Sequence, residues 1–173
     1  PDRNRLSPLE SDPLWKKARS GETVWGTVQL DSARLVFEGG DTLIETVMIQ
    51  RASGNGILQR GLFMWFAIPV FDAAGDIALV MYGGRTLNHN DEFVDRLREL
   101  LFSNEQFRGK PLGTITVFLD SIRVATNVID LDNRRAIGTV VSPDVQRRVL
   151  YEGLTWHDRA YVVDAWYISG YQP

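Results

Sequence analysis

The chain has 173 residues, enough for one medium-sized domain or two small ones, and its 44% hydrophobic and 24% charged residues are ordinary for a globular protein. The net charge of −3 and the scattered basic residues argue against nucleic acid as a partner, because phosphate binding needs a concentrated basic face. The absence of cysteine excludes thiolate metal sites, c-type haem attachment and cysteine nucleophiles.

The first predicted elements are a short helix, a strand and a longer helix. Residues 11–13 combine capping side chains with a proline, which is typical of a helix start. Residues 23–28 are rich in β-forming side chains and predict a strand. Apolar residues recur at helical spacing over residues 31–48, and a glycine pair at 39–40 interrupts that helix.

Two apolar runs in the middle of the chain predict a β-hairpin. Residues 61–71 and 77–84 flank a loop of aspartate, alanine and glycine. Both runs are apolar on both faces. We therefore expect one face to meet helices and the other face to meet a second layer or a cavity.

A helix over residues 90–102 is the most regular pattern of the chain. Its first turn is acidic, which suits the helix dipole, and its apolar stripe is expected to face a core. The stripe consists of Phe93, Val94, Leu97, Leu100 and Leu101. The helix divides the chain into two parts, residues 1–88 and residues 89–173.

The second part is rich in β-structure. Strands are predicted at residues 113–119 and 122–128, a short helix at 143–152, and two further strands at 160–163 and 166–171. A hairpin, a short helix and a second hairpin on one antiparallel sheet form the arrangement of a PAS-like sensor fold.

Signatures of catalysis are absent from the sequence. It contains no G-x-S-x-G elbow, phosphate-binding loop, H-E-x-x-H pair or dinucleotide-binding glycine motif. His89 and His157 have no metal-like spacing, and no pair of carboxylates stands out. We expect no enzyme activity in this domain and no metal site, although a hydrolase or isomerase on this scaffold is an alternative.

The predicted strand at residues 122–128 carries candidate ligand-binding residues. Its alternation places Arg123, Ala125 and Asn127 on one face. A guanidinium can bind both oxygens of a carboxylate, and a nearby amide can donate a further hydrogen bond. The alternative is a solvent-facing strand with ordinary polar residues.

Aromatic residues near the end of the chain are candidate pocket walls. Tyr161, Tyr167 and Tyr171 share one alternation phase, unless the bend at residues 164–165 resets it. Tyrosine and tryptophan combine an apolar body with a polar tip, which suits a pocket that closes over a small polar ligand. Packing in an ordinary core is the alternative.

Segments in both parts of the chain resemble bacterial Cache domains, and more narrowly the Cache 3/Cache 2 fusion type. In the first part the resemblance covers residues 61–84, 87–88 and 93–95. In the second part it is carried by RGKPLGTITVF (108–118), RVATNV (123–128), RAIGT (135–139), VS (141–142), RAYVV (159–163) and WY (166–167).

The resemblance implies an α/β (α+β) fold of PAS-like Cache type, with antiparallel sheets flanked by helices and two PAS-like modules joined by a helix. Residues 1–88 are expected to form a first, Cache 3-like part. Residues 89–173 are expected to form a second, Cache 2-like module with the likelier ligand pocket. The long N-terminal helix of such domains and their final strand are not in this sequence, which begins at Pro1, and we interpret the chain as a piece of a longer protein.

The resemblance also implies the extracytoplasmic sensing region of a bacterial transmembrane receptor, either a chemotaxis transducer or a sensor histidine kinase. Such a receptor is usually a homodimer, and this region touches the membrane only through flanking helices. We expect a periplasmic location, a small-molecule ligand of organic-acid type and no cofactor. The alternative is a structural or interaction domain with a vestigial pocket, which dimerises or binds a periplasmic protein.

Seven residues are the predicted ligand-binding set. Arg123 is expected to anchor a carboxylate, Asn127 and Thr126 to add donors, and Thr139 to donate from a loop. The predicted wall or lid residues are Tyr161, Trp166 and Tyr167.

Overall fold

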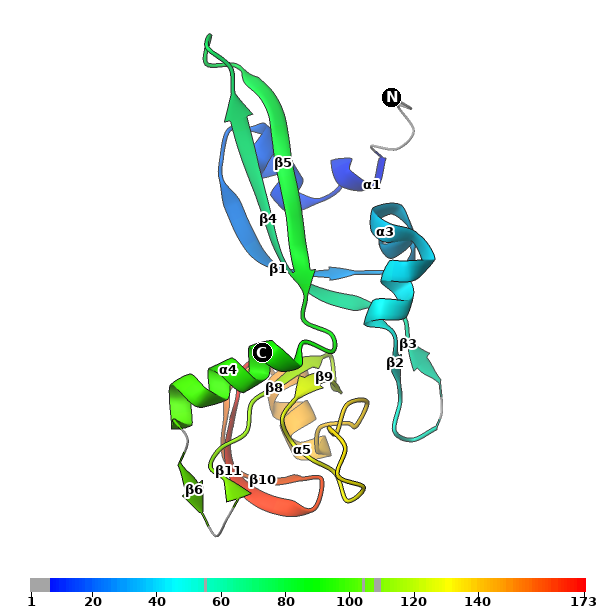
Figure 1. Cartoon of the computed structure of the whole chain (residues 1–173), viewed down its shortest axis with the longest axis vertical. Coiled ribbons are helices and arrows are strands. Elements are labelled where there is room, and N and C mark those ends of the chain that lie inside the picture. Colours follow the sequence, from blue (N-terminus) through cyan, green and yellow to red (C-terminus); the bar gives the residue numbers. More distant parts are fainter. Residues whose placement is uncertain (1–6, 55, 104, 108–109) are drawn as a thin grey trace. The chain divides into compact units, whose positions relative to one another are not determined.

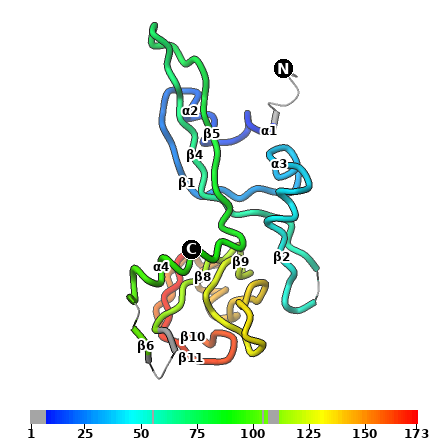
Figure 2. The backbone as a smooth tube through the Cα atoms, viewed as in Figure 1, coloured from blue at the N-terminus to red at the C-terminus, as the bar shows by residue number. Residues whose placement is uncertain are grey.

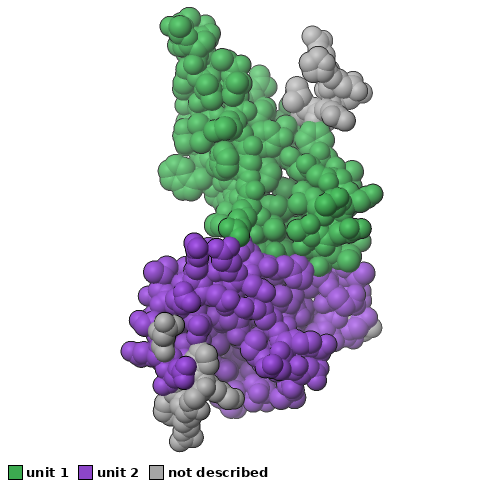
Figure 3. All heavy atoms as spheres, in the orientation of Figure 1, with its two compact units in different colours: residues 1–48, 59–88 green, residues 49–58, 89–173 purple. Residues whose placement is uncertain are grey.

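A computed structural model describes residues 7–54, 56–103, 105–107 and 110–173. The chain forms two compact units (Figure 3). Unit 1 comprises Pro1–Met48 and Gln59–Asn88, and unit 2 comprises Ile49–Leu58 and His89–Pro173. Among the described residues, no helix combines the length and the apolar character of a membrane span.

Unit 1 is a three-stranded antiparallel sheet with helices on one face (Figure 1). Its strands follow the order β1-β4-β5, and β4 and β5 run side by side as a long hairpin (Figure 2). The hairpin and strand predictions are thereby confirmed. The elements are α1 (Ser7–Glu10), α2 (Pro13–Arg19), β1 (Val24–Leu30), α3 (Ser32–Val47), β4 (Gly61–Phe71) and β5 (Ile77–Thr86).

Local signals account for the helices of unit 1. The Asp12 side chain caps α2 by accepting hydrogen bonds from the backbone N–H groups of Leu14 and Trp15, at 2.8 and 3.2 Å. Asp31 caps α3 in the same way, through the N–H of Arg34 at 2.8 Å. Within α3, Gly40 adopts a φ of 64° and kinks the helix, as the glycine pair predicts.

The inner face of the sheet holds the core of unit 1. Side chains from α2, α3 and all three strands meet there around the ring of Tyr82, which lies 5.3 Å from Trp15 and 5.8 Å from Trp65 between ring centroids. Asn88 closes the unit, because its buried amide donates to the carbonyls of Val47 and Arg60 at 2.6 and 3.0 Å.

The other face of this sheet differs from the prediction. We expected a second layer or a cavity over it, but in the described part of the chain its apolar side chains are exposed. They are Trp25, Met64, Phe66, Val70, Leu79 and Met81, with Ile68 half-buried among them. The apolar character of a strand does not reveal whether a partner layer belongs to the same chain.

Unit 2 is built from short antiparallel strand pairs and helical segments. The predicted helix at residues 90–102 is confirmed, with Asn90 as its cap. The elements are β2 (Ile49–Gln50), β3 (Ile57–Leu58), α4 (Asp91–Phe102), β6 (Gln106–Phe107), β7 (Lys110–Pro111), β8 (Thr116–Leu119), β9 (Ile122–Thr126), α5 (Pro143–Gln146), η2 (Arg147–Tyr151), β10 (Trp156–Val162) and β11 (Ala165–Tyr171). Residues 108 and 109, which begin one of the Cache-like segments, lie outside the described residues.

The two predicted hairpins of unit 2 form, but not on one sheet. β8 pairs with β9 and β10 pairs with β11, and these are separate two-stranded sheets in the described residues. The β8–β9 register shifts between Val117 and Phe118, so that Val124 is an extra residue on β9. Pairing between distant strands is not encoded in their local alternation, which is why this prediction was wrong.

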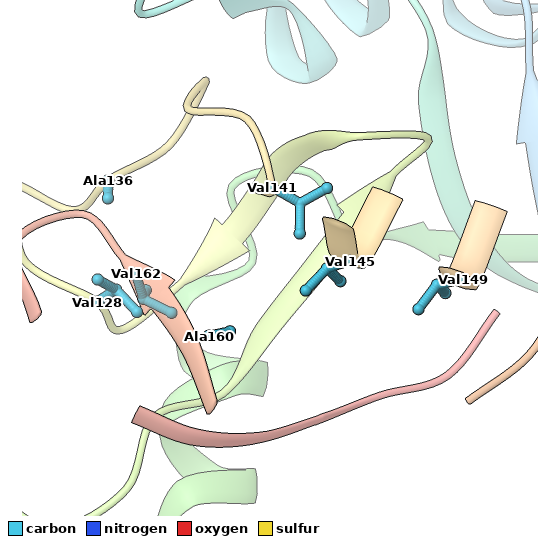
Figure 4. Packing of buried hydrophobic residues seen from close by; sticks show 7 residues of the cluster. All are labelled: Val128, Ala136, Val141, Val145, Val149, Ala160 and Val162. Carbon is cyan, nitrogen blue, oxygen red and sulfur yellow. The ribbon is translucent and has the colours of Figure 1, made fainter. Parts of the chain in front are cut away.

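Valine and alanine side chains hold unit 2 together between its second hairpin and its helical segment (Figure 4). Leucines of α4 and of the helical segment lie outside this core. Leu100 and Leu101 at the end of the predicted α4 stripe are 80% and 67% exposed, and Leu150 is 40% exposed. The core cluster is Val128, Ala136, Val141, Val145, Val149, Ala160 and Val162.

Gly138 brings residues 49–58 against the rest of unit 2. Its φ is +81°, and a Cβ at this position would lie 2.1 Å from the carbonyl oxygen of Gln50. The backbone N–H of Ala52 donates to the Gly138 carbonyl at 3.0 Å. The glycine is therefore required both by its conformation and by the close approach of a second backbone.

Candidate functional site

Arg123 is the centre of the candidate site. It lies in β9 and is only 3% exposed. Its backbone N–H donates to the carbonyl of Thr139, and its own carbonyl accepts from the N–H of Gly138, both at 2.9 Å. Two local features therefore hold the residue in place: the bulged hairpin on one side and the loop at residues 135–141 on the other.

The guanidinium of Arg123 has partners, but none of them is an acid. Its Nη1 donates to Thr139 Oγ1, and its Cζ lies 5.2 Å from the centroid of the Phe118 ring. Thr139 Oγ1 donates in turn to the carbonyl of Ala136 at 2.7 Å. Arg123 Nε is buried without a hydrogen-bond partner, and no described carboxylate forms an ion pair with this side chain.

Burial lowers the pKa of Arg123, and the phenol of Tyr171 acts in the opposite direction. An arginine still carries its charge at neutral pH despite such a shift. The site therefore combines a dehydrated cation with an unused donor, and this combination favours the binding of an anion.

Thr126 and Asn127 lie at the end of the same strand but differ in what they offer. Thr126 is fully buried, and its hydroxyl is engaged with Thr116 Oγ1 at 2.6 Å and with the N–H of Val128 at 3.1 Å. Asn127 accepts through Oδ1 from the N–H of Ile115 at 2.8 Å, whereas its Nδ2 is buried without a partner among the described residues. Of these two residues, Asn127 therefore has the donor that a ligand could use.

The aromatic candidates divide between the two faces of the β10–β11 hairpin. Tyr161 and Trp166 are cross-strand neighbours on the solvent-exposed face of this hairpin, where they are 50% and 69% exposed and their ring centroids lie 5.5 Å apart. Tyr167 and Tyr171 pack against the core instead. Tyr167 and Tyr171 therefore share one phase and Tyr161 does not, because the turn at residues 163–164 resets the alternation, which was the alternative for this segment.

Two residues of the Arg123 surroundings were missing from the predicted set. Phe118 lies under the guanidinium, and Tyr171 lies 5.9 Å from Phe118 between ring centroids. Phe118 is the β8 partner of Arg123 in the hairpin register. Cross-strand pairing in the predicted hairpin is the signal that could have found it.

Arg135 ties the loop beside the site to α4. Its guanidinium bonds Asp95 at 2.7 Å, Asp91 at 3.2 Å and the carbonyl of Thr126 at 2.8 Å. The hydrogen bond to Asp95 raises the pKa of Arg135, despite partial desolvation. Unlike Arg123, this arginine is saturated by acids of its own unit.

No competing centre of chemistry is found elsewhere in the described residues. No group of three or more histidine, aspartate or glutamate side chains there could hold a metal ion. Unit 1 has an open surface cavity of about 580 Å³ that includes Asp12, Asp31 and Arg34, and none of the predicted site residues lines it. Arg34 is already paired with Glu38 at 2.5 Å and with Asp12 at 3.5 Å.

Comparison with known proteins bears on this arrangement. No curated protein and no solved structure matches the chain. The sequence model of the family described as Single cache domain 3 matches residues 85–173, which include the Arg123 site and more than half of the chain. The resemblance to Cache domains and the α+β fold with antiparallel sheets are thereby confirmed. The chain belongs to the single Cache domain 3 family, whose domains are extracellular sensors rather than catalysts.

Proposed function

We propose that this chain is the extracytoplasmic ligand-sensing region of a bacterial transmembrane receptor, a chemotaxis transducer or a sensor histidine kinase, and that it binds a small carboxylate through Arg123. The receptor would be anchored by flanking membrane helices and would expose this region to the periplasm. The family supports the sensing role, and the Arg123 site supports the chemistry of the ligand.

One observation carries the proposal: Arg123 is buried and charged, yet it has no acidic partner among the described residues. A buried charge without a counterion is costly, and buried charges in proteins are ordinarily paired. Arg135 of the same unit, by contrast, is paired with Asp95. The binding of a carboxylate would supply the missing counterion.

The geometry of the guanidinium suits an anion with two accepting oxygens, such as a carboxylate. Thr139 occupies Nη1, while Nε is buried without a partner among the described residues. Arginine binds a carboxylate through two parallel N–H groups, and the Phe118 ring supports the guanidinium from one face. Asn127 Nδ2 offers a second donor on the same hairpin, which suits a ligand with an additional polar group.

A thermal-shift screen of the full chain against organic acids, amino acids, amines and purines tests the proposal. We expect an acid to raise the melting temperature in a dose-dependent way, because a ligand that binds only the folded state stabilises it. Arg123→Ala should weaken that binding by about ten- to a hundredfold, since charged hydrogen bonds contribute roughly 1.5–3 kcal/mol.

The control is Arg159→Ala, which removes an exposed arginine from β10 of the same unit. It should leave the affinity unchanged. An acid that binds equally well to wild type and to Arg123→Ala would show that Arg123 is not the anchor. A screen in which amines or purines are the only ligands would contradict the carboxylate class itself.

A further inference from the structure

Tyr171, the last residue of β11, lies in the surroundings of Arg123. Its ring packs against Phe118 with 5.9 Å between the ring centroids, and the Arg123 guanidinium lies 5.2 Å from the centroid of that same ring. The two residues therefore meet at Phe118 from different hairpins. Burial is the larger influence on the pKa of Arg123 and lowers it, whereas the Tyr171 phenol raises it, so the phenol lies within electrostatic reach of the guanidinium.

The hydroxyl of Tyr171 is unused by the fold. The residue is half-buried, yet its Oη forms no hydrogen bond within the described part of the chain. Its cross-strand partner Trp156 is satisfied, because Trp156 Nε1 donates to the carbonyl of Asp158 at 3.2 Å. Aromatic residues that pack against a core normally find a partner for their polar tip in this way. Arg123 Nε also lacks a partner, so the site has two donors to offer, a guanidinium N–H and a phenol O–H.

The surroundings of Arg123 hold no second charge that could pair with a ligand. Within the described ranges, neither an acid nor another cation acts on the pKa of Arg123. The acids Asp91 and Asp95 of α4, a helix that packs against β9, are bound to Arg135. A second carboxylate or an ammonium group on the ligand would thus lose its water without gaining a counterion, which is costly.

We infer that Tyr171 is a ligand-binding residue of the Arg123 site, whose hydroxyl donates to the carboxylate that the guanidinium holds, and that the site selects acids with one carboxylate and no other charge. This inference rests on the proposed carboxylate binding and adds to it a second contact residue and a limit on the charge of the ligand. A phenol O–H bonded to a carboxylate is a charge-assisted hydrogen bond, and such bonds are stronger than neutral ones.

Titration calorimetry of the full chain with a panel of small acids tests the charge limit. The panel compares acids of the same chain length with and without a second charged group: propionate with malonate and alanine, and butyrate with succinate. We expect the better of propionate and butyrate to bind at least about tenfold more tightly than its doubly charged analogues, because the extra charge is dehydrated without a partner.

Tyr171→Phe tests the hydroxyl. This substitution keeps the ring against Phe118 and removes only the O–H, so the dissociation constant of the monocarboxylate should rise about tenfold. The melting temperature without ligand should match wild type, since the hydroxyl has no partner to lose in the described residues. Tyr151→Phe is the matched control, because Tyr151 is a 75% exposed tyrosine of the same unit, and its loss of a hydroxyl should leave the affinity unchanged.

The outcomes separate this inference from the proposed function. If Arg123→Ala weakens binding but Tyr171→Phe binds like wild type, the role of Tyr171 is overturned while carboxylate binding stands. Malonate, succinate or alanine that binds as tightly as the monocarboxylates would overturn the charge limit in the same way. An absence of binding by every acid, or equal binding to wild type and Arg123→Ala, would overturn both.

Discussion

Arg123 and Arg135 lie in the same unit but in opposite electrostatic situations. Arg135 is held by Asp91 and Asp95, whereas Arg123 is surrounded by a hydroxyl, an aromatic ring and backbone. The cation–π contact with Phe118 and one hydrogen bond offset only part of the cost of burying a charge. We therefore expect Arg123 to destabilise the folded state in the absence of ligand, a trade of stability for function that is common in functional sites.

This contrast predicts opposite effects of two similar substitutions. In the absence of ligand, Arg123→Met should raise the free energy of unfolding by about 1–2 kcal/mol, because a buried charge is replaced by an apolar side chain of similar length. Arg135→Met should lower it by about 1–2 kcal/mol, because the aspartates lose their partner. Urea unfolding of both variants measures the difference. A marked loss of stability in Arg123→Met would mean that the arginine is structural.

Tyr82 should make the stability of unit 1 depend on pH. Burial, and next the nearby Glu38, raise its pKa above the ordinary value of 10.0. The folded state thus favours the neutral phenol. The stability that this provides is fully present below pH 10.0 and is lost as the pH rises through the higher pKa of the folded state.

Melting curves recorded from neutral pH to above pH 10.0 test this dependence. Tyr82→Phe should flatten the decline at alkaline pH relative to wild type, since phenylalanine has no proton to lose. An identical decline in both proteins would assign the pH effect to other groups.

One glycine of unit 2 admits the close approach of a neighbouring backbone. This residue is Gly138, where a positive φ and the contact with Gln50 exclude a side chain. Gly138→Ala should lower the free energy of unfolding by at least about 2 kcal/mol, through strain and overpacking together.

Gly153→Ala separates these two causes. Gly153 also has a positive φ, +65°, but a Cβ at this position would meet no other atom within 4 Å. We expect a loss of about 1 kcal/mol from backbone strain alone. Equal losses for both variants in urea unfolding would contradict the role of the close approach at Gly138.

Ligand binding should slow hydrogen exchange in one part of the molecule and leave it unchanged in another. The Arg123 backbone is hydrogen-bonded to Gly138 and Thr139, so a ligand held by the guanidinium would stabilise β9 and the loop at residues 135–141. Hydrogen exchange at a saturating concentration of the stabilising acid should slow there and stay unchanged in β1, β4 and β5. Identical exchange with and without ligand would contradict a shift of populations on binding.

The individual elements could be predicted from the sequence because their signals are local. The Asp12 cap, the glycine kink in α3, the long hairpin and the stripe of α4 all depend on residues a few positions apart. The Cache resemblance and the choice of Arg123 also rest on contiguous motifs.

Only the tertiary structure decided which faces are covered and which charges are paired. Whether Arg123 meets an acid, whether Tyr161 points inward, and whether the two hairpins share a sheet all depend on segments distant in the sequence. The same holds for the face of the unit 1 sheet that points away from the helices. Its strands are as apolar as buried strands, but its side chains are exposed. By itself, the sequence therefore determined the elements and the family of this protein. Long-range packing decided the electrostatic state of its site and the exposure of its surfaces, because burial is a property of contacts between distant residues and not of local pattern.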